Sequence, residues 1–161
     1  MASCLIFARD KRYNYRIMKE LILKKNITIK APVSKVWDAL TKPEWTNKYM
    51  FNCDAISEWK KGSPLIWKGH QDGKVYVKGQ IVDIKPKQLL EFTTFDPNGE
   101  LPDIPDNYTK VSYKLASENG HTKLFVSDGD FSKVGNGEKR YQETVKGWEV
   151  TLNKLKEEVE K

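Results

Sequence analysis

The C-terminal part of the chain carries large apolar residues at regular intervals. Six of them follow one another at steps of four, three, four, three and four positions: Tyr141, Val145, Trp148, Leu152, Leu155 and Val159. These steps place all six on one face of an α-helix. The spacing predicts a helix over residues 138–160, about 34 Å long at 1.5 Å per residue. A helix of that length can cover the whole apolar face of a sheet.

Gly147 stands inside this predicted helix, where it costs about 1 kcal/mol relative to alanine. A glycine at such a position indicates the close approach of another element or an open space beside the helix.

Residues 20–49 are predicted to form one strand followed by two short helices. Residues 20–30 alternate between apolar and polar side chains and predict a β-strand. Pro32 ends this strand because proline lacks a backbone donor. Ser34 is expected to cap the first short helix. Pro43 suits the first turn of a second helix that ends at Tyr49.

The middle of the chain reads as strands separated by turn residues. Six strands are predicted over residues 52–59, 65–69, 74–84, 89–95, 108–117 and 122–130. The pairs Asp72-Gly73 and Asn119-Gly120 tolerate the positive φ of tight hairpins. Apolar and polar side chains alternate over 108–117, so one face of the sheet is exposed to water. The pattern therefore predicts an antiparallel sheet.

Together these elements predict an α+β helix-grip fold, in which a curved seven-stranded antiparallel sheet wraps around the long C-terminal helix. The two short helices after the first strand close one end. One helix is only about 10 Å wide. A sheet of seven strands is wider than that, and a cavity between sheet and helix is expected.

Residues 27–45, Ile-Thr-Ile-Lys-Ala-Pro-Val-Ser-Lys-Val-Trp-Asp-Ala-Leu-Thr-Lys-Pro-Glu-Trp, resemble the opening of a known superfamily. It is the SRPBCC (START-like, helix-grip) superfamily, and the closest branch is that of the activator of heat-shock-protein-90 ATPase homologues. Further matches are Gly-Ser-Pro-Leu-Ile-Trp at 62–67, Gly129-Asp130-Phe131, and Gly147-Trp148 in the closing helix. The resemblance covers residues 20–160.

The resemblance implies a deep apolar pocket under the C-terminal helix, which the superfamily uses for lipids, polyketides, hormones and other hydrophobic molecules. Some distant members are cyclases or hydrolytic enzymes, but the branch has no shared catalytic motif. Residues 18–161 are expected to form a single START-like helix-grip domain. Residues 1–17 are expected to be a basic, flexible N-terminal extension.

The net charge of +6 suggests nucleic-acid binding until its distribution is considered. Residues 1–17 hold four basic side chains and one acidic one, and so carry half of the excess. Lysines and acids alternate over the remaining residues, as on an ordinary solvated surface. We therefore expect no nucleic-acid partner.

Other function classes are excluded by what the sequence lacks. No apolar run approaches the roughly 20 residues that span a bilayer, so no membrane insertion is expected. Two cysteines and two histidines cannot build a disulfide framework or a zinc site of the usual spacing. We expect no metal, no cofactor and a cytoplasmic location.

Aromatic residues are the candidates for a binding site, because tyrosine and tryptophan give apolar walls with a polar group at one end. The alternative is that each one is simply part of the core. The predicted cavity lining is Trp37, Tyr49, Met50, Phe51, Trp67, Tyr76, Phe92, Tyr113, Tyr141, Val145 and Trp148.

Two carboxylates, Asp128 and Asp130, share one face of the last predicted strand. They are either a paired acid–base site or, as the preferred interpretation, Asp130 accepts backbone hydrogen bonds where the strand ends. No residue is predicted to be catalytic.

Three functions follow from these observations. The first is non-catalytic binding of a hydrophobic small molecule or lipid in the cavity, by a monomer or weak homodimer. The second is a chaperone-associated or stress-response interaction protein, as the family resemblance implies. The third is a cyclase-like or hydrolase-like enzyme that uses the same pocket.

Overall fold

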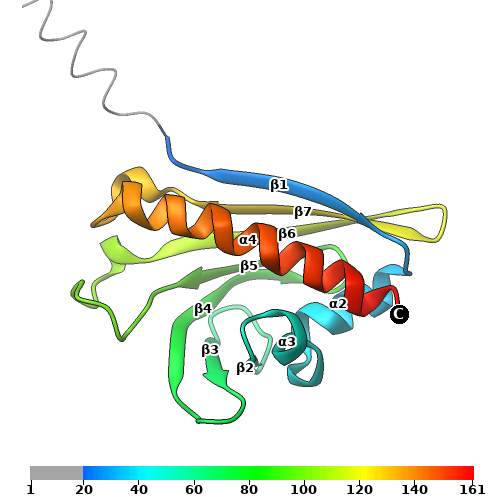
Figure 1. Cartoon of the computed structure of the whole chain (residues 1–161), viewed down its shortest axis with the longest axis horizontal. Coiled ribbons are helices and arrows are strands. Elements are labelled where there is room, and N and C mark those ends of the chain that lie inside the picture. Colours follow the sequence, from blue (N-terminus) through cyan, green and yellow to red (C-terminus); the bar gives the residue numbers. More distant parts are fainter. Residues whose placement is uncertain (1–19) are drawn as a thin grey trace, which may run out of the picture.

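The computed structural model describes residues 20–161, which contain three α-helices and one seven-stranded antiparallel sheet (Figure 1). The extension predicted for residues 1–17 lies outside the described residues. The elements in chain order are β1 (Leu23–Ile29), α2 (Val33–Thr41), α3 (Pro43–Tyr49), β2 (Cys53–Ser57), β3 (Pro64–Gly69), β4 (Val75–Lys85), β5 (Leu89–Thr94), η1 (Pro105–Asn107), β6 (Thr109–Glu118), β7 (His121–Gly129), η2 (Phe131–Lys133) and α4 (Gly137–Val159). This order confirms the predicted α+β helix-grip fold.

The cap predicted for the first short helix was wrong. Pro32 occupies the N-cap position of α2, with φ −66° and ψ 152°, and Ser34 lies within the helix. Proline fixes its own φ near this value, so the chain turns into the helix two residues earlier than expected. The second helix begins at Pro43 as predicted.

The strands follow the order β1-β7-β6-β5-β4-β3-β2 across the sheet. Each strand after β2 pairs with its neighbour in the chain, whereas β1 crosses to the far edge and pairs with β7. The predicted turn at Asn119-Gly120 joins β6 to β7, with φ values of 51° and 79°. Such values suit a two-residue hairpin because its turn needs positive φ at both central residues.

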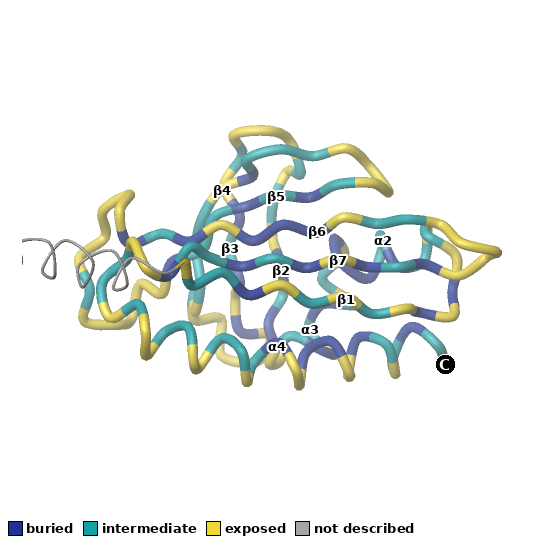
Figure 2. The backbone as a smooth tube through the Cα atoms, turned by 90° about the horizontal axis from the view of Figure 1, so that it is seen from above, coloured by how far each residue is buried: buried dark blue, intermediate teal, exposed yellow. Residues whose placement is uncertain are grey.

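Helix α4 lies across the concave face of this sheet, and α2 and α3 lie beside its C-terminal half (Figure 1). Trp148, Leu152, Leu155 and Val159 are buried, whereas Tyr141 and Val145 are only partly buried. Figure 2 shows the same division, with buried residues concentrated in the C-terminal half of α4. The predicted apolar stripe therefore packs fully only where α2 and α3 support it.

The N-terminal end of α4 is tied to the loop between β5 and β6. The backbone oxygen of Asn107 accepts hydrogen bonds from both terminal nitrogens of Arg140, each at 3.1 Å. The Asn107 side chain accepts a bond from the Gly135 backbone N–H at 3.1 Å and donates one to the Pro102 oxygen at 2.9 Å. These bonds fix the half of α4 that the core covers least.

Candidate functional site

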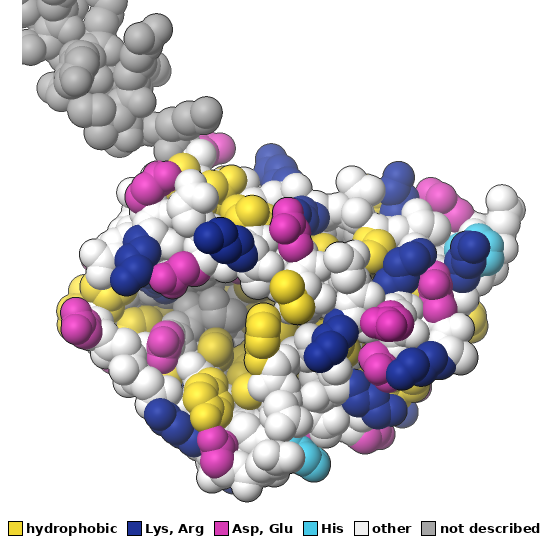
Figure 3. All heavy atoms as spheres, in the orientation of Figure 1, with side chains coloured by type: hydrophobic (Ala, Val, Ile, Leu, Met, Phe, Trp, Pro, Cys, Tyr) yellow, Lys and Arg dark blue, Asp and Glu magenta, His cyan; other side chains and the backbone are white. Residues whose placement is uncertain are grey.

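A cavity of about 760 Å³ lies between the sheet and α4. Its walls come from strands β3 to β7, from the corner between α3 and β2, and from the inner face of α4. Figure 3 shows the hollow on this face of the molecule, bordered by hydrophobic side chains with both acidic and basic ones near its rim.

Gly147 borders the cavity, and a Cβ added at this position would meet no atom within 4 Å. Of the two expectations for this glycine, open space beside the helix is therefore the one observed.

Seven of the eleven residues predicted to line a cavity border this one: Met50, Phe51, Trp67, Tyr76, Phe92, Tyr113 and Trp148. The other four, Trp37, Tyr49, Tyr141 and Val145, lie elsewhere. Tyr49 is 2% exposed, and its hydroxyl donates to the Ala39 backbone oxygen at 2.7 Å, so it belongs to the core. Tyr141 packs edge-on against Phe131 at 6.1 Å. Trp37 and Val145 pack against the core cluster.

A continuous row of aromatic rings runs from the sheet to the helix. Trp67 on β3 contacts Phe92 on β5 with ring centroids 6.2 Å apart. Phe92 contacts Tyr113 on β6 at 5.6 Å, and Tyr113 and Trp148 on α4 pack edge-to-face with ring centroids 5.9 Å apart. Tilted and edge-to-face arrangements of this kind are favourable for aromatic pairs. They give one wall of the cavity a rigid apolar surface.

Asp128 is a buried carboxylate on this wall, only 6% exposed. Its Oδ2 accepts a hydrogen bond from Trp148 Nε1 at 2.9 Å, while Oδ1 has no partner of acceptable geometry among the described residues. Burial raises the pKa of Asp128 to about 6, against the opposing effects of the Trp148 N–H, the nearby Thr109 hydroxyl and the positive charge of Arg140.

Asp130 has a different environment and a different role. Its Oδ1 accepts hydrogen bonds from the backbone N–H groups of Leu21 at 3.0 Å and Ser132 at 2.9 Å, and from the Ser132 hydroxyl at 2.7 Å. Slight burial opposes ionisation, but these bonds outweigh it and hold the pKa of Asp130 below its usual value. Asp130 thus orders the end of β7, as the preferred interpretation expected, and the two carboxylates share no partner.

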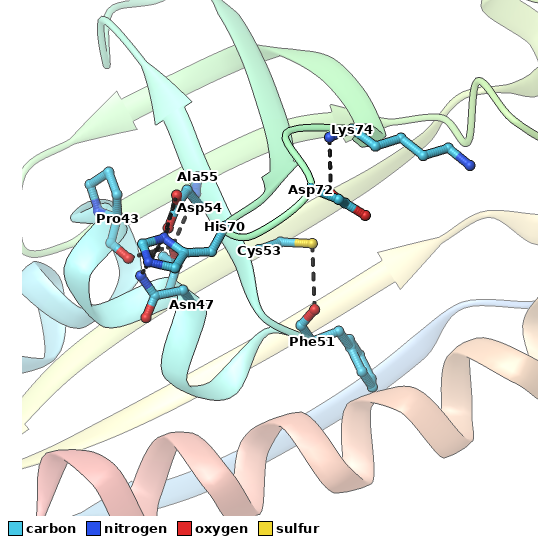
Figure 4. A network of polar contacts seen from close by, with 10 residues as sticks. Pro43, Asn47, Phe51, Cys53, Asp54, Ala55, His70, Asp72 and Lys74 are labelled. Carbon is cyan, nitrogen blue, oxygen red and sulfur yellow. Dashed lines mark hydrogen bonds and ion pairs between the residues drawn. The ribbon is translucent and has the colours of Figure 1, made fainter.

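A polar cluster that the sequence did not indicate lies beside the cavity, and one of its members, His70, borders the cavity (Figure 4). His70 Nδ1 lies 2.9 Å from Asp54 Oδ2, and the Asn47 amide donates to Asp54 Oδ1 at 2.9 Å. Slight burial raises the pKa of Asp54, yet the hydrogen bonds from Asn47 and His70 bring it below its usual value. The β2–β3 hairpin brings these residues together, since Cys53 pairs with Gly69 beside them.

The corner that leads into β2 has an unusual backbone. Phe51 and Asn52 both adopt left-handed conformations, with φ of 48° and 61°. Phe51 is 65% exposed at the cavity rim, and Figure 4 shows its ring extending from the corner toward α4. A bulky residue with positive φ is energetically unfavourable and is found where the surrounding structure enforces it.

The family model of the activator of Hsp90 ATPase homolog 1-like proteins matches residues 30–160. The chain belongs to this family. The resemblance expected from the sequence, to the branch of the SRPBCC superfamily named for that activator, is thereby confirmed. Among curated proteins, no match was found.

Several solved structures are similar to this chain in fold. The solution structure of ChR145 from Cytophaga hutchinsonii is 32% identical, with a TM-score of 0.70 over 86% of this chain and 93% of that one. The Aha1 dimer from Colwellia psychrerythraea has 19% identity and a TM-score of 0.64, covering 86% and 96% of the two chains. CalU16 from Micromonospora echinospora has 20% identity and a TM-score of 0.65, covering 83% and 71%.

The described residues were also compared with the requirements for a membrane span and for a metal site. Within residues 20–161, no helix is long and apolar enough to cross a membrane. The same part of the chain contains no group of three His, Cys, Asp or Glu side chains placed to share a metal ion.

Proposed function

We propose that the chain binds a hydrophobic small molecule or lipid between the sheet and α4 without changing it chemically. One observation carries this proposal, namely a cavity of about 760 Å³ with a wall of contacting aromatic rings. Pockets for small molecules fall within roughly 300–1,000 Å³ and combine apolar walls with a few polar groups. Here Asp128, Thr109 and Arg140 supply such groups.

Exposed apolar surface at the cavity rim supports the same function. Phe51 and Tyr76 both border the cavity, and they are 65% and 40% exposed. A bound apolar molecule that removed such surface from water would gain roughly 25 cal/mol for each Å². The entrance of the cavity therefore exposes apolar surface to water, and a bound ligand would cover this surface.

Proteins with the same fold provide weaker support. DynU16, which has 17% identity and a TM-score of 0.68, is a protein of the dynemicin biosynthetic locus. That likeness shows the fold alone.

Native mass spectrometry of the purified chain tests this function. We expect an additional mass on the folded protein that disappears on mild denaturation. A protein that carries no such mass, and that also fails to bind added neutral apolar dyes, would contradict the proposal.

A second candidate is interaction with a chaperone, which the family's own description favours. A pull-down with Hsp90 tests it, and capture that persists when the cavity is blocked would support it as a separate function. The Colwellia protein is described as a dimer. For this chain we propose a monomer or weak homodimer, which light scattering after gel filtration can determine.

A further inference from the structure

The charged groups that line the cavity have the opposite sign to the chain as a whole. Lysine and arginine exceed aspartate and glutamate by six in the full sequence. Four carboxylates nevertheless border the cavity, from Asp72, Asp96, Asp128 and Glu143, against the single guanidinium of Arg140. None of the lysines among residues 20–161 lines it. The cavity is therefore acidic within a basic protein.

The one cation in this lining is already engaged. Arg140 donates to the Asn107 backbone oxygen through both terminal nitrogens. It also lies close enough to Asp128 and Asp96 for both carboxylates to favour its charged form, although burial lowers its pKa. Little of its charge is left to attract an anionic ligand.

Hydrogen bonds fix the positions of two of these carboxylates, those of Asp72 and Asp128. Asp72 accepts hydrogen bonds from the Tyr76 hydroxyl at 2.5 Å and from the Lys74 backbone N–H at 3.0 Å, and these bonds keep its pKa below the usual value. Asp128 is buried beside the cavity, and its Oδ1 has no partner among the described residues and almost no accessible surface. Its carboxylate would therefore act on a ligand in the cavity through its charge.

The apolar part of the lining suits the same kind of ligand. Eight phenylalanine, tyrosine and tryptophan side chains border the cavity: Phe51, Trp67, Tyr76, Phe92, Phe95, Tyr113, Phe131 and Trp148. Aromatic faces attract cations as well as apolar groups, most strongly where water is excluded. Carboxylates combined with aromatic rings favour an ammonium group and disfavour a carboxylate or phosphate.

We propose that the cavity selects hydrophobic cations, meaning amines attached to an apolar or aromatic body, and discriminates against fatty acids and other anionic amphiphiles. This inference rests on the proposed ligand-binding function and specifies its chemistry. Asp128 on β7 and the more exposed Glu143 on α4 both border the cavity, so the charge of each would attract an ammonium group bound there.

Three probes with the same ten-carbon chain test this selectivity: decylamine, decanol and decanoate. Tryptophan fluorescence reports their binding at neutral pH, because Trp67 and Trp148 border the cavity. We expect decylamine to bind about tenfold more tightly than decanoate, with decanol between them. Equal or tighter binding of decanoate would overturn the inference and leave the proposed function intact. Binding of none of the three would instead overturn the proposed function.

Variants that neutralise single carboxylates show which of them attract decylamine. Glu143→Gln should weaken decylamine binding about threefold more than it weakens decanol binding. Glu157→Gln is the matched control, since it removes the same charge from an exposed position on α4 outside the cavity. Asp128→Asn should weaken decylamine binding further. Equal losses in the Glu143 and Glu157 variants would show that overall charge, not the cavity, attracts the amine, and would overturn the inference.

Discussion

The indole nitrogen of Trp148 donates a hydrogen bond to Oδ2 of Asp128 over 2.9 Å, within the interior of the protein. This bond joins the middle of α4 to β7 on the wall of the cavity. A buried carboxylate is unfavourable unless it is paired. Here a neutral donor satisfies only one of its two oxygens, so the relationship makes both stability and ligand binding sensitive to Asp128.

Asp128→Asn should make the protein more stable at neutral and alkaline pH. The folded-state pKa of about 6 lies above the ordinary value of 3.8, so the folded protein binds this proton more tightly than the unfolded chain. Ionisation of Asp128 therefore has no effect on stability below about pH 4, where both states are protonated. The stability of the wild type falls as the pH rises from about 4 to about 6, and the loss stays constant at higher pH. We expect the variant to gain about 1–3 kcal/mol at pH 8. Urea unfolding between pH 4 and pH 8 measures the difference in free energy of unfolding between the variant and the wild type. A difference that does not shrink between pH 6 and pH 4 would contradict the raised pKa of Asp128.

Trp148→Phe should destabilise the protein more at high pH than at low pH. Phenylalanine keeps an aromatic ring but removes the N–H that the carboxylate requires. Leaving a buried charge without its donor costs about 1–3 kcal/mol, whereas a protonated Asp128 depends on it less. Urea unfolding at pH 8 and pH 4.5 separates this effect from the pH-independent loss of ring volume. In the double variant with Asp128→Asn, the dependence on pH should disappear.

Gly147→Ala should stabilise α4 by about 1 kcal/mol, because glycine is a poor helix former and the added methyl group enters open space. Thermal unfolding checks this expectation. A loss of stability would mean that the space beside the helix is smaller than the structure shows.

Tyr49→Phe should cost about 1–2 kcal/mol of stability, since it leaves the buried oxygen of Ala39 without its donor. Ligand binding should be unchanged, because Tyr49 does not border the cavity. Denaturant unfolding combined with a binding titration distinguishes this core role from the lining role that the sequence predicted. A clear loss of affinity at unchanged stability would restore the lining interpretation.

Most of the fold could be predicted from the sequence because its signals are local. The stripe from Tyr141 to Val159 specifies a helix, and the turn at Asn119-Gly120 specifies a hairpin, without knowledge of any distant residue. Ser34 was misjudged because Pro32 already fixes the start of α2. The extent of burial along α4 was not predictable, since it depends on where α2 and α3 support the helix.

The site was only partly predictable because it depends on contacts between distant segments. Trp148 and Asp128 are 20 positions apart and meet only through the packing of α4 on β7. Asp54 and His70 come together only because β2 and β3 pair in one particular register. The order of residues along the chain does not reveal that register. Sequence could identify aromatic residues on strands and helices, but it could not distinguish Tyr49 in the core from Tyr113 on the cavity wall.

The central claim is that the space beside α4 binds a ligand, and blocking that space tests it most directly. Gly147→Leu should fill part of the cavity from a position where an added side chain meets no neighbour at its first atom, and Gly147→Ala is its matched control. A titration with the neutral apolar dye Nile red should show binding to the wild type and to the alanine variant, and at least about tenfold weaker binding to the leucine variant at comparable stability. Equal binding by all three proteins would contradict the account.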